Sequence, residues 1–97
     1  MAKIKIKLVG TLRNSLESSV IEVATERRVS FRELVQLAAE QTGKNLLPYI
    51  ADPNNREILQ WVMVLVNQEN IRHLQGWDTL LDEEDEIWVM LADIAGG

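Results

Sequence analysis

Strict alternation of apolar and polar side chains at both ends of the chain constrains the fold more than any other feature of the sequence. Residues 3–9 read KIKIKLV and residues 86–91 read EIWVML, so every second residue in each segment is a large aliphatic one. A period of two sends successive side chains to opposite faces of a β-strand. Both segments are therefore predicted to be strands, each with one face toward a core and the other toward water or a partner.

Between these strands the sequence predicts two more strands and one main helix. Residues 20–23 are short and rich in β-branched side chains, which indicates a strand antiparallel to the first. Residues 61–66 form the most apolar run and are predicted to be a central strand. Ser30 and Glu33 have the spacing of a capping box that begins a helix, and Gly43 is suited to end it. This order indicates an α+β fold in which the helix lies across one face of the sheet.

The remaining segments are predicted to be connections. Residues 12–19 are interpreted as a polar, turn-rich loop anchored by Leu16, and residues 44–60 as a short buried turn or one-turn helix followed by a turn. We expect a brief strand at residues 71–74. The pair Leu80–Leu81 is expected to plug the core.

The composition leaves little room for catalysis by the chain itself. The chain has 97 residues, which fits a single domain, and it has no cysteine. Thiolate metal sites and cysteine nucleophiles are therefore excluded, and the lone His73 cannot form a zinc site by itself. The five glycines do not form a phosphate-binding loop, and the net charge of −5 argues against nucleic acid as a partner. We expect a protein that is not an enzyme and binds neither metal nor cofactor.

The sequence also argues against a membrane protein. No apolar run approaches the roughly 18–20 residues that span a bilayer. The N-terminal segment alternates lysine with isoleucine and does not resemble a signal peptide. We therefore expect a cytoplasmic protein that is a monomer when alone.

The order of the predicted elements, together with short sequence matches, resembles the ubiquitin-like sulfur carriers of the MoaD and ThiS type. The MoaD-like branch, which includes the small subunit of molybdopterin synthase, fits best. The resemblance runs along the whole chain and is densest from residue 61 onward. The matching residues are Val66–Asn67, Ile71–Arg72, Leu74–Gln75–Gly76, Asp78–Thr79, Asp85–Glu86–Ile87 and Ala95–Gly96–Gly97.

This resemblance implies a β-grasp fold. We expect one ubiquitin-like domain over residues 1–97, with a mixed sheet of four to five strands and one main helix packed across one face. The first and last strands would be adjacent and parallel at the centre of the sheet. Residues from about 92 to 97 would form a flexible Gly-Gly tail.

The resemblance also implies a function for the end of the chain. The carboxylate of Gly97 would be adenylated by an E1-like enzyme of the MoeB or ThiF type, which would use ATP and magnesium. It would then become a thiocarboxylate that donates sulfur through a MoaE-like synthase subunit in molybdopterin biosynthesis. Gly96 and Ala95 would let the tail thread into the partner, because glycine allows the closest approach of backbone to backbone.

Other interpretations of the tail remain open at this point. The carrier could serve thiamine, cysteine or transfer-RNA thiolation in place of molybdopterin. The chain could be a protein modifier conjugated through Gly97, or a binding module whose Gly–Gly end is only a frayed terminus.

The outward face of the predicted sheet is a candidate partner-binding surface. Exposed patches with an apolar centre and charged edges mark interaction sites, and tryptophan and methionine are enriched in them. The alternative is that the 44–60 segment wraps over this face and buries it. The candidate residues are Lys5, Lys7, Met63, Leu65, Trp88 and Met90.

The other polar and aromatic candidates are assigned structural roles. Trp61 and Trp77 are predicted to pack in the core or at its edge, and His73 to lie at the surface. Residues 82–85, DEED, lack the spaced ligands and the glycine of a calcium loop. We interpret them as a solvated acidic turn that could attract a basic patch on the activating enzyme.

Overall fold

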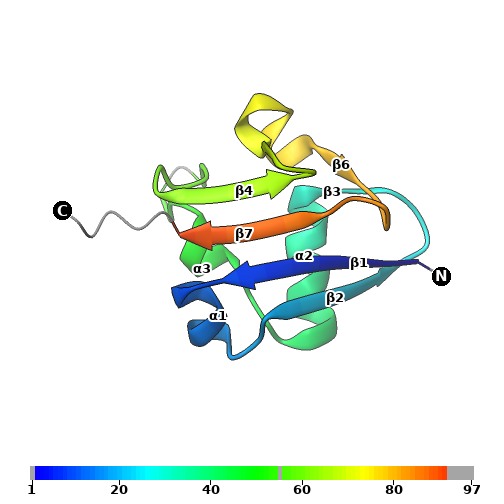
Figure 1. The fold of residues 1–97 in the computed structure, drawn as a ribbon, viewed down its shortest axis with the longest axis horizontal. Helices are drawn as coiled ribbons and strands as arrows, with labels where there is room; N and C mark the ends of the chain where they lie inside the picture. The colour runs from blue at the N-terminus through cyan, green and yellow to red at the C-terminus, as the bar shows by residue number, and fades with distance from the viewer. Residues whose placement is uncertain (1, 55, 92–97) are drawn as a thin grey trace.

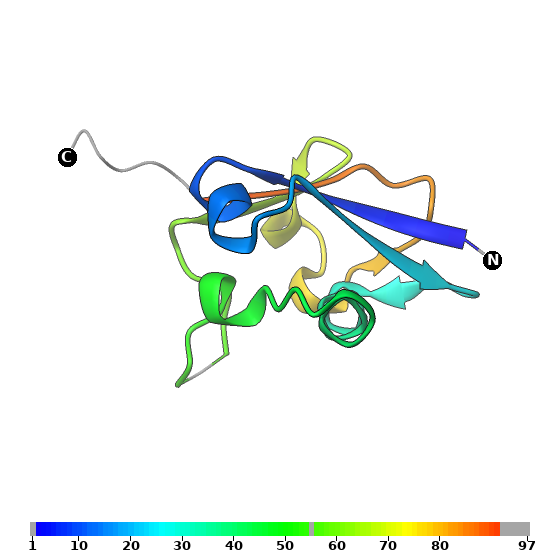
Figure 2. The same ribbon diagram turned by 90° about the horizontal axis from the view of Figure 1, so that it is seen from below.

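The computed structural model describes residues 2–54 and 56–91 and consists of one main sheet, a helix layer beneath it and a small second sheet (Figures 1 and 2). The main sheet has five strands in the order β2-β1-β7-β4-β5, and the small sheet pairs β3 with β6. The strands are β1 (Ala2–Val9), β2 (Val20–Thr25), β3 (Val29–Ser30), β4 (Val62–Val66), β5 (Glu69–Asn70), β6 (Leu80–Leu81) and β7 (Ile87–Leu91). The helices are α1 (Thr11–Leu16), α2 (Phe31–Thr42) and α3 (Leu47–Ile50), with 3₁₀ turns η1 (Ile71–His73) and η2 (Gly76–Asp78).

The two end strands are adjacent and parallel at the middle of the sheet, as predicted (Figure 1). Ile6 lies opposite Ile87, and Leu8 lies opposite Val89. On either side of this pair, β2 and β4 run antiparallel to their neighbours. The predicted β-grasp architecture, a mixed sheet that holds one main helix, is confirmed.

The alternation in the strands separates a buried face from an open one. Helix α2 lies beneath the sheet in Figure 2 and contributes apolar side chains at helical spacing to a single core. Fully buried aliphatic side chains of all four longer strands meet it there. The buried set from these elements is Ile4, Ile6, Leu8, Ile21, Val23, Phe31, Leu34, Val35, Ala38, Val62, Val64, Val66, Ile87 and Val89.

The ends of α2 are fixed by the residues that the sequence singled out. The Ser30 side chain accepts a hydrogen bond from the Glu33 N–H at 3.1 Å, and the Glu33 carboxylate accepts one from the Ser30 N–H at 3.4 Å. At the other end Gly43 has φ 77°, and its N–H donates to the Ala39 carbonyl. Only glycine adopts that conformation without steric cost.

The interactions at the N-terminus of α2 predict that the stability of the fold depends on pH. The Arg27 guanidinium, 2.8 Å from the Glu33 carboxylate, and then the Ser30 N–H hold the pKa of Glu33 below its ordinary value of 4.5. A carboxyl whose pKa is lower in the folded state stabilises the fold above its ordinary pKa, and this contribution is lost as pH falls through the lowered value. Urea midpoints measured from neutral pH to about pH 3 should therefore fall less steeply for Glu33→Gln than for the unaltered chain. Equal slopes would contradict this role of Glu33.

One predicted loop is a helix. Within the 12–19 segment the structure forms α1, which buries Leu12 as well as Leu16. This helix has no side-chain N-cap. At its C-terminus the Glu17 N–H donates to the carbonyls of Arg13 and Asn14, and the Lys44 ammonium donates to the Leu16 carbonyl at 3.0 Å. A six-residue helix of this kind is stabilised by its tertiary contacts, because isolated helices so short do not form in water.

Three further predictions were wrong in part. Residues 71–74 contain the 3₁₀ turn η1, and the short strand β5 comes before them, after a tight turn. Leu81 is buried as predicted, but Leu80 is 57% exposed because adjacent residues of a strand point to opposite faces. Trp61 was predicted to pack in the core or at its edge, but it is 46% exposed and is not among the residues that pack in or against the core. Trp77 does pack against the core, where its ring stacks on Phe31.

The described part of the 44–60 segment lies on the helix side of the sheet and leaves the outward face open (Figure 2). It contains the predicted single helical turn, α3. Leu46 and Ile50 are fully buried in the core shared with α2, although Leu47 and Tyr49 between them are exposed. The alternative in which this segment covers the outward face is therefore wrong.

Side chains satisfy backbone groups at the edge strand β2 and where the chain enters β4. At edge strand β2 the Gln41 amide accepts from the Ala24 N–H and donates to the Ala24 carbonyl, each at 2.8 Å. Near β4 the Arg72 guanidinium donates to the carbonyls of Val62 and Ile58 at 2.9 and 3.1 Å, and also to that of Leu59. Edge strands with free N–H and C=O groups are templates for self-association.

Replacing Gln41 with alanine should therefore make the chain self-associate. The change exposes the Ala24 N–H and carbonyl, and it should lower the free energy of unfolding by only about 1 kcal/mol because water replaces the lost bonds. Gln36→Ala, on an exposed position of the same helix, is the matched control. Sedimentation velocity over a range of concentrations should show dimers or larger species for Gln41→Ala alone; identical profiles would contradict an edge-blocking role.

Candidate functional site

The open face of the sheet brings the predicted partner-binding residues into two cross-strand rows. In the first row Trp88 lies between Lys7 on β1 and Leu65 on β4. In the second row Met90 lies between Val9 on β1 and Met63 on β4. Directly opposite side chains on one face are about 4.5–5.5 Å apart at Cβ, so each row is continuous. The side chains of both rows are half-buried, which leaves an accessible apolar strip across the three central strands.

Trp88, at the centre of the first row, is held in a defined position. Its indole N–H donates to the Glu86 carboxylate at 3.1 Å, and the Lys7 ammonium lies 4.9 Å from the ring centroid. Lys7 and Glu86 are also 3.9 Å apart, so the three side chains form one unit. A positioned tryptophan loses little entropy when a partner packs on it, which is one reason tryptophan dominates binding hot spots.

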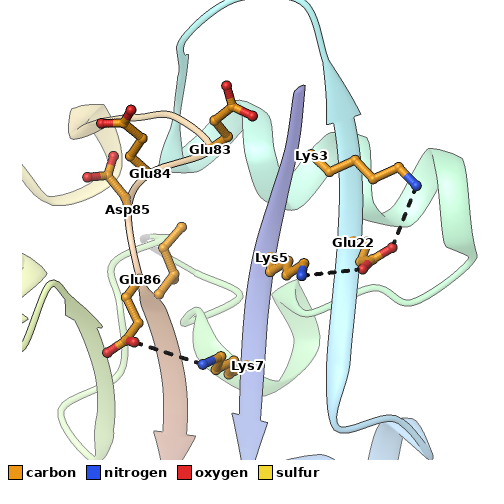
Figure 3. A pocket seen from close by; sticks show the side chains of 9 residues that line it. Lys3, Lys5, Lys7, Glu22, Glu83, Glu84, Asp85 and Glu86 are labelled. Carbon is orange, nitrogen blue, oxygen red and sulfur yellow. Dashed lines mark ion pairs between the residues drawn. The ribbon is translucent and has the colours of Figure 1, made fainter. Parts of the chain in front are cut away.

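A charged depression borders the apolar strip, and Lys5 lies in it (Figure 3). In Figure 3, Lys3 and Lys5 of β1 point toward Glu22 of β2, and Lys7 points toward Glu86, just before β7. Lys3 and Lys5 are 3.9 and 4.0 Å from the two carboxylate oxygens of Glu22. Exposed pairs at such distances contribute little to stability. Their charges can instead guide the approach of a partner.

The acidic turn uses its carboxylates to hold its own backbone. Asp85 accepts from the Asp82 N–H at 2.8 Å and from the Asn67 amide at 2.9 Å, and Asp82 accepts from the Glu84 N–H at 2.9 Å. Over residues 2–54 and 56–91 no group of three or more histidine, cysteine or acidic side chains is placed to hold a metal ion. His73 is exposed, as predicted.

The last described residue, Leu91, pairs with Val62 at the end of the sheet where β1 also ends and α1 begins (Figure 1). The chain reaches this point along β7, which pairs with β1 on one side and β4 on the other. Ala95, Gly96 and Gly97 lie outside the described residues, so their assigned roles stay predictions.

Two contributors to this face were not among the predicted site residues. Val9 extends the second row, and Glu86 orients Trp88. The sequence held a signal for Glu86, because residues two apart on a strand share a face. For Val9 the sequence shows only that it shares a face of the N-terminal strand with Lys5 and Lys7. It does not show that Val9 lies beside Met90, which is more than 80 residues away in the sequence.

A mixed sheet with its first and last strands parallel and adjacent, and with α2 packed across one face, is the β-grasp fold of ubiquitin-like proteins. The ThiS family model matches residues 6–97, and the chain belongs to the ThiS family. No curated protein sequence matches the chain.

Solved structures of ubiquitin-like proteins share the fold over nearly their whole length. Small archaeal modifier protein 1 of Haloferax volcanii has a TM-score of 0.77 at 16% identity, covering 99% of this chain and 100% of the other. The protein of the same name from Methanosarcina acetivorans has a TM-score of 0.70 at 26% identity, covering 100% and 98%. The putative molybdopterin converting factor, subunit 1, of Pyrococcus furiosus has a TM-score of 0.65 at 18% identity, covering 95% and 99%.

No helix in the described part of the chain is both long and apolar enough to cross a membrane.

Proposed function

We propose that this protein is a sulfur carrier whose working atom is the carboxyl carbon of Gly97. The observation that carries the proposal is the family match, which runs through to Gly97 at the end of the sequence. A carboxylate is a poor acyl donor. Its attack on the α-phosphorus of ATP releases pyrophosphate and forms an acyl-adenylate, from which sulfide can then displace AMP to leave a thiocarboxylate.

In this proposal the partner enzyme supplies ATP, magnesium and the catalytic groups. The chain supplies a rigid body, a surface for docking, and the last residues that enter the partner's site. Gly96 and Ala95 would thread that site, since backbone without bulky side chains can approach other backbone closely. The strip formed by Met63, Leu65, Trp88 and Met90 would hold the E1-like enzyme, and then the sulfur-accepting subunit.

Molybdopterin synthesis is the pathway we favour within this class. The support is the MoaD-like pattern of short sequence matches together with the shared fold of the Pyrococcus furiosus protein. A cytoplasmic location fits such a pathway. Finding genes for a MoeB-like and a MoaE-like protein beside the gene for this chain would support the assignment, and genes of thiazole or cysteine synthesis there would move it to another pathway.

Conjugation to other proteins through Gly97 is the second candidate function. The observation that favours it is the 26% identity with the small archaeal modifier protein of Methanosarcina acetivorans. Conjugates of higher mass in cell extracts that contain the chain, and that vanish when Gly97 is removed, would support the modifier.

Adenylation of Gly97 is the first step of both candidate functions, and an assay of this step tests the proposal. The E1-like enzyme, ATP and magnesium should exchange labelled pyrophosphate into ATP only when this chain is present. Exchange that proceeds equally without the chain, or that never occurs although the enzyme activates another carrier, would contradict the proposal.

A further inference from the structure

A second groove is formed by elements that lie beneath the sheet in Figure 2, on the side away from its open face. It is formed by α2, α3, the turn after α3 and Trp77, and it encloses about 690 Å³. Pockets of several hundred Å³ with mostly apolar walls are typical binding sites. Here the apolar wall comes from Leu47, Pro48, Pro53 and Trp77. Leu47 is 42% exposed, so this wall faces solvent.

The groove is built from elements that are bonded to one another. The Trp77 ring stacks on Phe31 of α2 with centroids 5.3 Å apart, and its indole N–H donates to the Arg56 carbonyl at 3.0 Å. The turn is closed by the Arg56 N–H, which donates to the Asp52 carbonyl at 2.8 Å. Such cross-connections form the groove before any ligand binds, which reduces the entropic cost of binding.

Two arginines line this apolar groove. Arg32 comes from α2 and Arg56 from the turn, and both are exposed. Arg32 lies over the Trp77 ring at 5.7 Å and 3.6 Å from the Asp78 carboxylate. Asp52 also lines the groove, and its carboxylate, which accepts from the Asn54 N–H at 2.7 Å, is a negative group beside the two arginines. The charged lining residues are thus two cations and one anion, a formal net charge of +1 in a chain of net charge −5, and exposed guanidinium groups beside an apolar floor are suited to carboxylates.

We propose that this groove binds an acidic segment of a partner protein. One aliphatic or aromatic side chain of the segment enters the floor beside Leu47 and Trp77, and flanking carboxylates pair with Arg32 and Arg56. The proposal does not depend on the function of Gly97. Because the groove and the open sheet face lie on opposite sides, both can be occupied at once.

The test uses a ten-residue peptide with a central leucine–phenylalanine pair between two glutamates on each side. In the full chain carrying Trp61→Phe and Trp88→Phe, Trp77 is the remaining tryptophan, so its fluorescence reports on the groove. The peptide should change this fluorescence saturably. A peptide with lysines in place of the glutamates, or serines in place of the leucine–phenylalanine pair, should bind at least about tenfold more weakly.

Variants of the groove separate this site from general charge attraction. Arg32→Glu and Arg56→Glu should each weaken the acidic peptide about tenfold or more, and Leu47→Ser should do the same without a change in charge. Arg13→Glu, on exposed α1, makes the same change in net charge elsewhere and should alter affinity less than about twofold. Urea midpoints of the variants establish that each is folded.

Three outcomes would overturn the proposal: equal binding of the acidic and basic peptides, equal loss in Arg13→Glu and Arg32→Glu, or no binding of the acidic peptide. A Trp77 response to phosphatidylserine vesicles but not to the peptide would replace it with a membrane site. Self-association that is lost in Leu47→Ser, without peptide binding, would assign the groove to a second copy of the chain.

Discussion

Removal of Gly97 is expected to lower the rate of adenylation by the E1-like enzyme by at least about 100-fold. The shortened chain still ends in a glycine carboxylate, but this carboxylate stops about 3.5 Å short of the reacting phosphate. A displacement of about 1 Å from the reactive geometry can already cost about 100-fold in rate. Chain-dependent pyrophosphate exchange at saturating carrier measures the effect.

The deletion needs a control that alters the end of the chain without shortening it. Asp93→Asn removes a charge and keeps the length, so it should change the exchange rate far less than the deletion does. A shortened chain that binds the enzyme with unchanged affinity but is not adenylated would locate the defect in the chemical step. Adenylation within about threefold of the unaltered chain would contradict the role of Gly97.

Trp88→Ala is expected to weaken binding of the activating enzyme by about 30-fold or more. Truncation of a central tryptophan in an interface typically costs about 2 kcal/mol or more, and 1.4 kcal/mol is tenfold in affinity. The ring lies between Lys7 and Leu65 on the open face, opposite to the face on which Ile87 and Val89 are buried. The free energy of unfolding should therefore fall by only about 1 kcal/mol, the range of strand propensities.

Tyr49→Ala is the comparison for this prediction. Tyr49 is 37% exposed on α3, on the helix side of the molecule, so its removal should leave binding of the enzyme unchanged. Affinity is measured by calorimetric titration and stability by urea denaturation. If Trp88→Ala unfolds the domain, or if the two variants bind equally well, the open face is not the docking surface.

Much of the fold could be predicted because its signals are local. The alternation in residues 3–9 and 86–91 selects the buried face of each strand without any knowledge of the partner strand. The capping box of Ser30 and Glu33 begins α2, and the left-handed Gly43 ends it. Each of these signals depends only on residues close together in the sequence. The same alternation predicts which residues lie on the open face, once the strands are assumed to form one sheet.

The parts that could not be predicted are held by distant contacts. Helix α1 has no side-chain N-cap, and the Lys44 ammonium that donates to the Leu16 carbonyl is 28 residues away in the sequence. The Gln41 amide meets Ala24 across 17 residues, and nothing in either sequence neighbourhood indicates that they pair. The groove beside Trp77 is lined by residues from three separate segments, and no local sequence pattern indicates that these residues come together.

The most direct test of the account is the intact mass of the chain after incubation with its E1-like enzyme, ATP, magnesium and a sulfur donor. Exchange of one carboxylate oxygen for sulfur should add about 16 Da, and fragmentation should place the gain on Gly97. The Gly97 deletion should show no gain under the same conditions. An unchanged mass, with the same enzyme active on another carrier, or a gain located on any other residue, would contradict the central claim that Gly97 carries the sulfur.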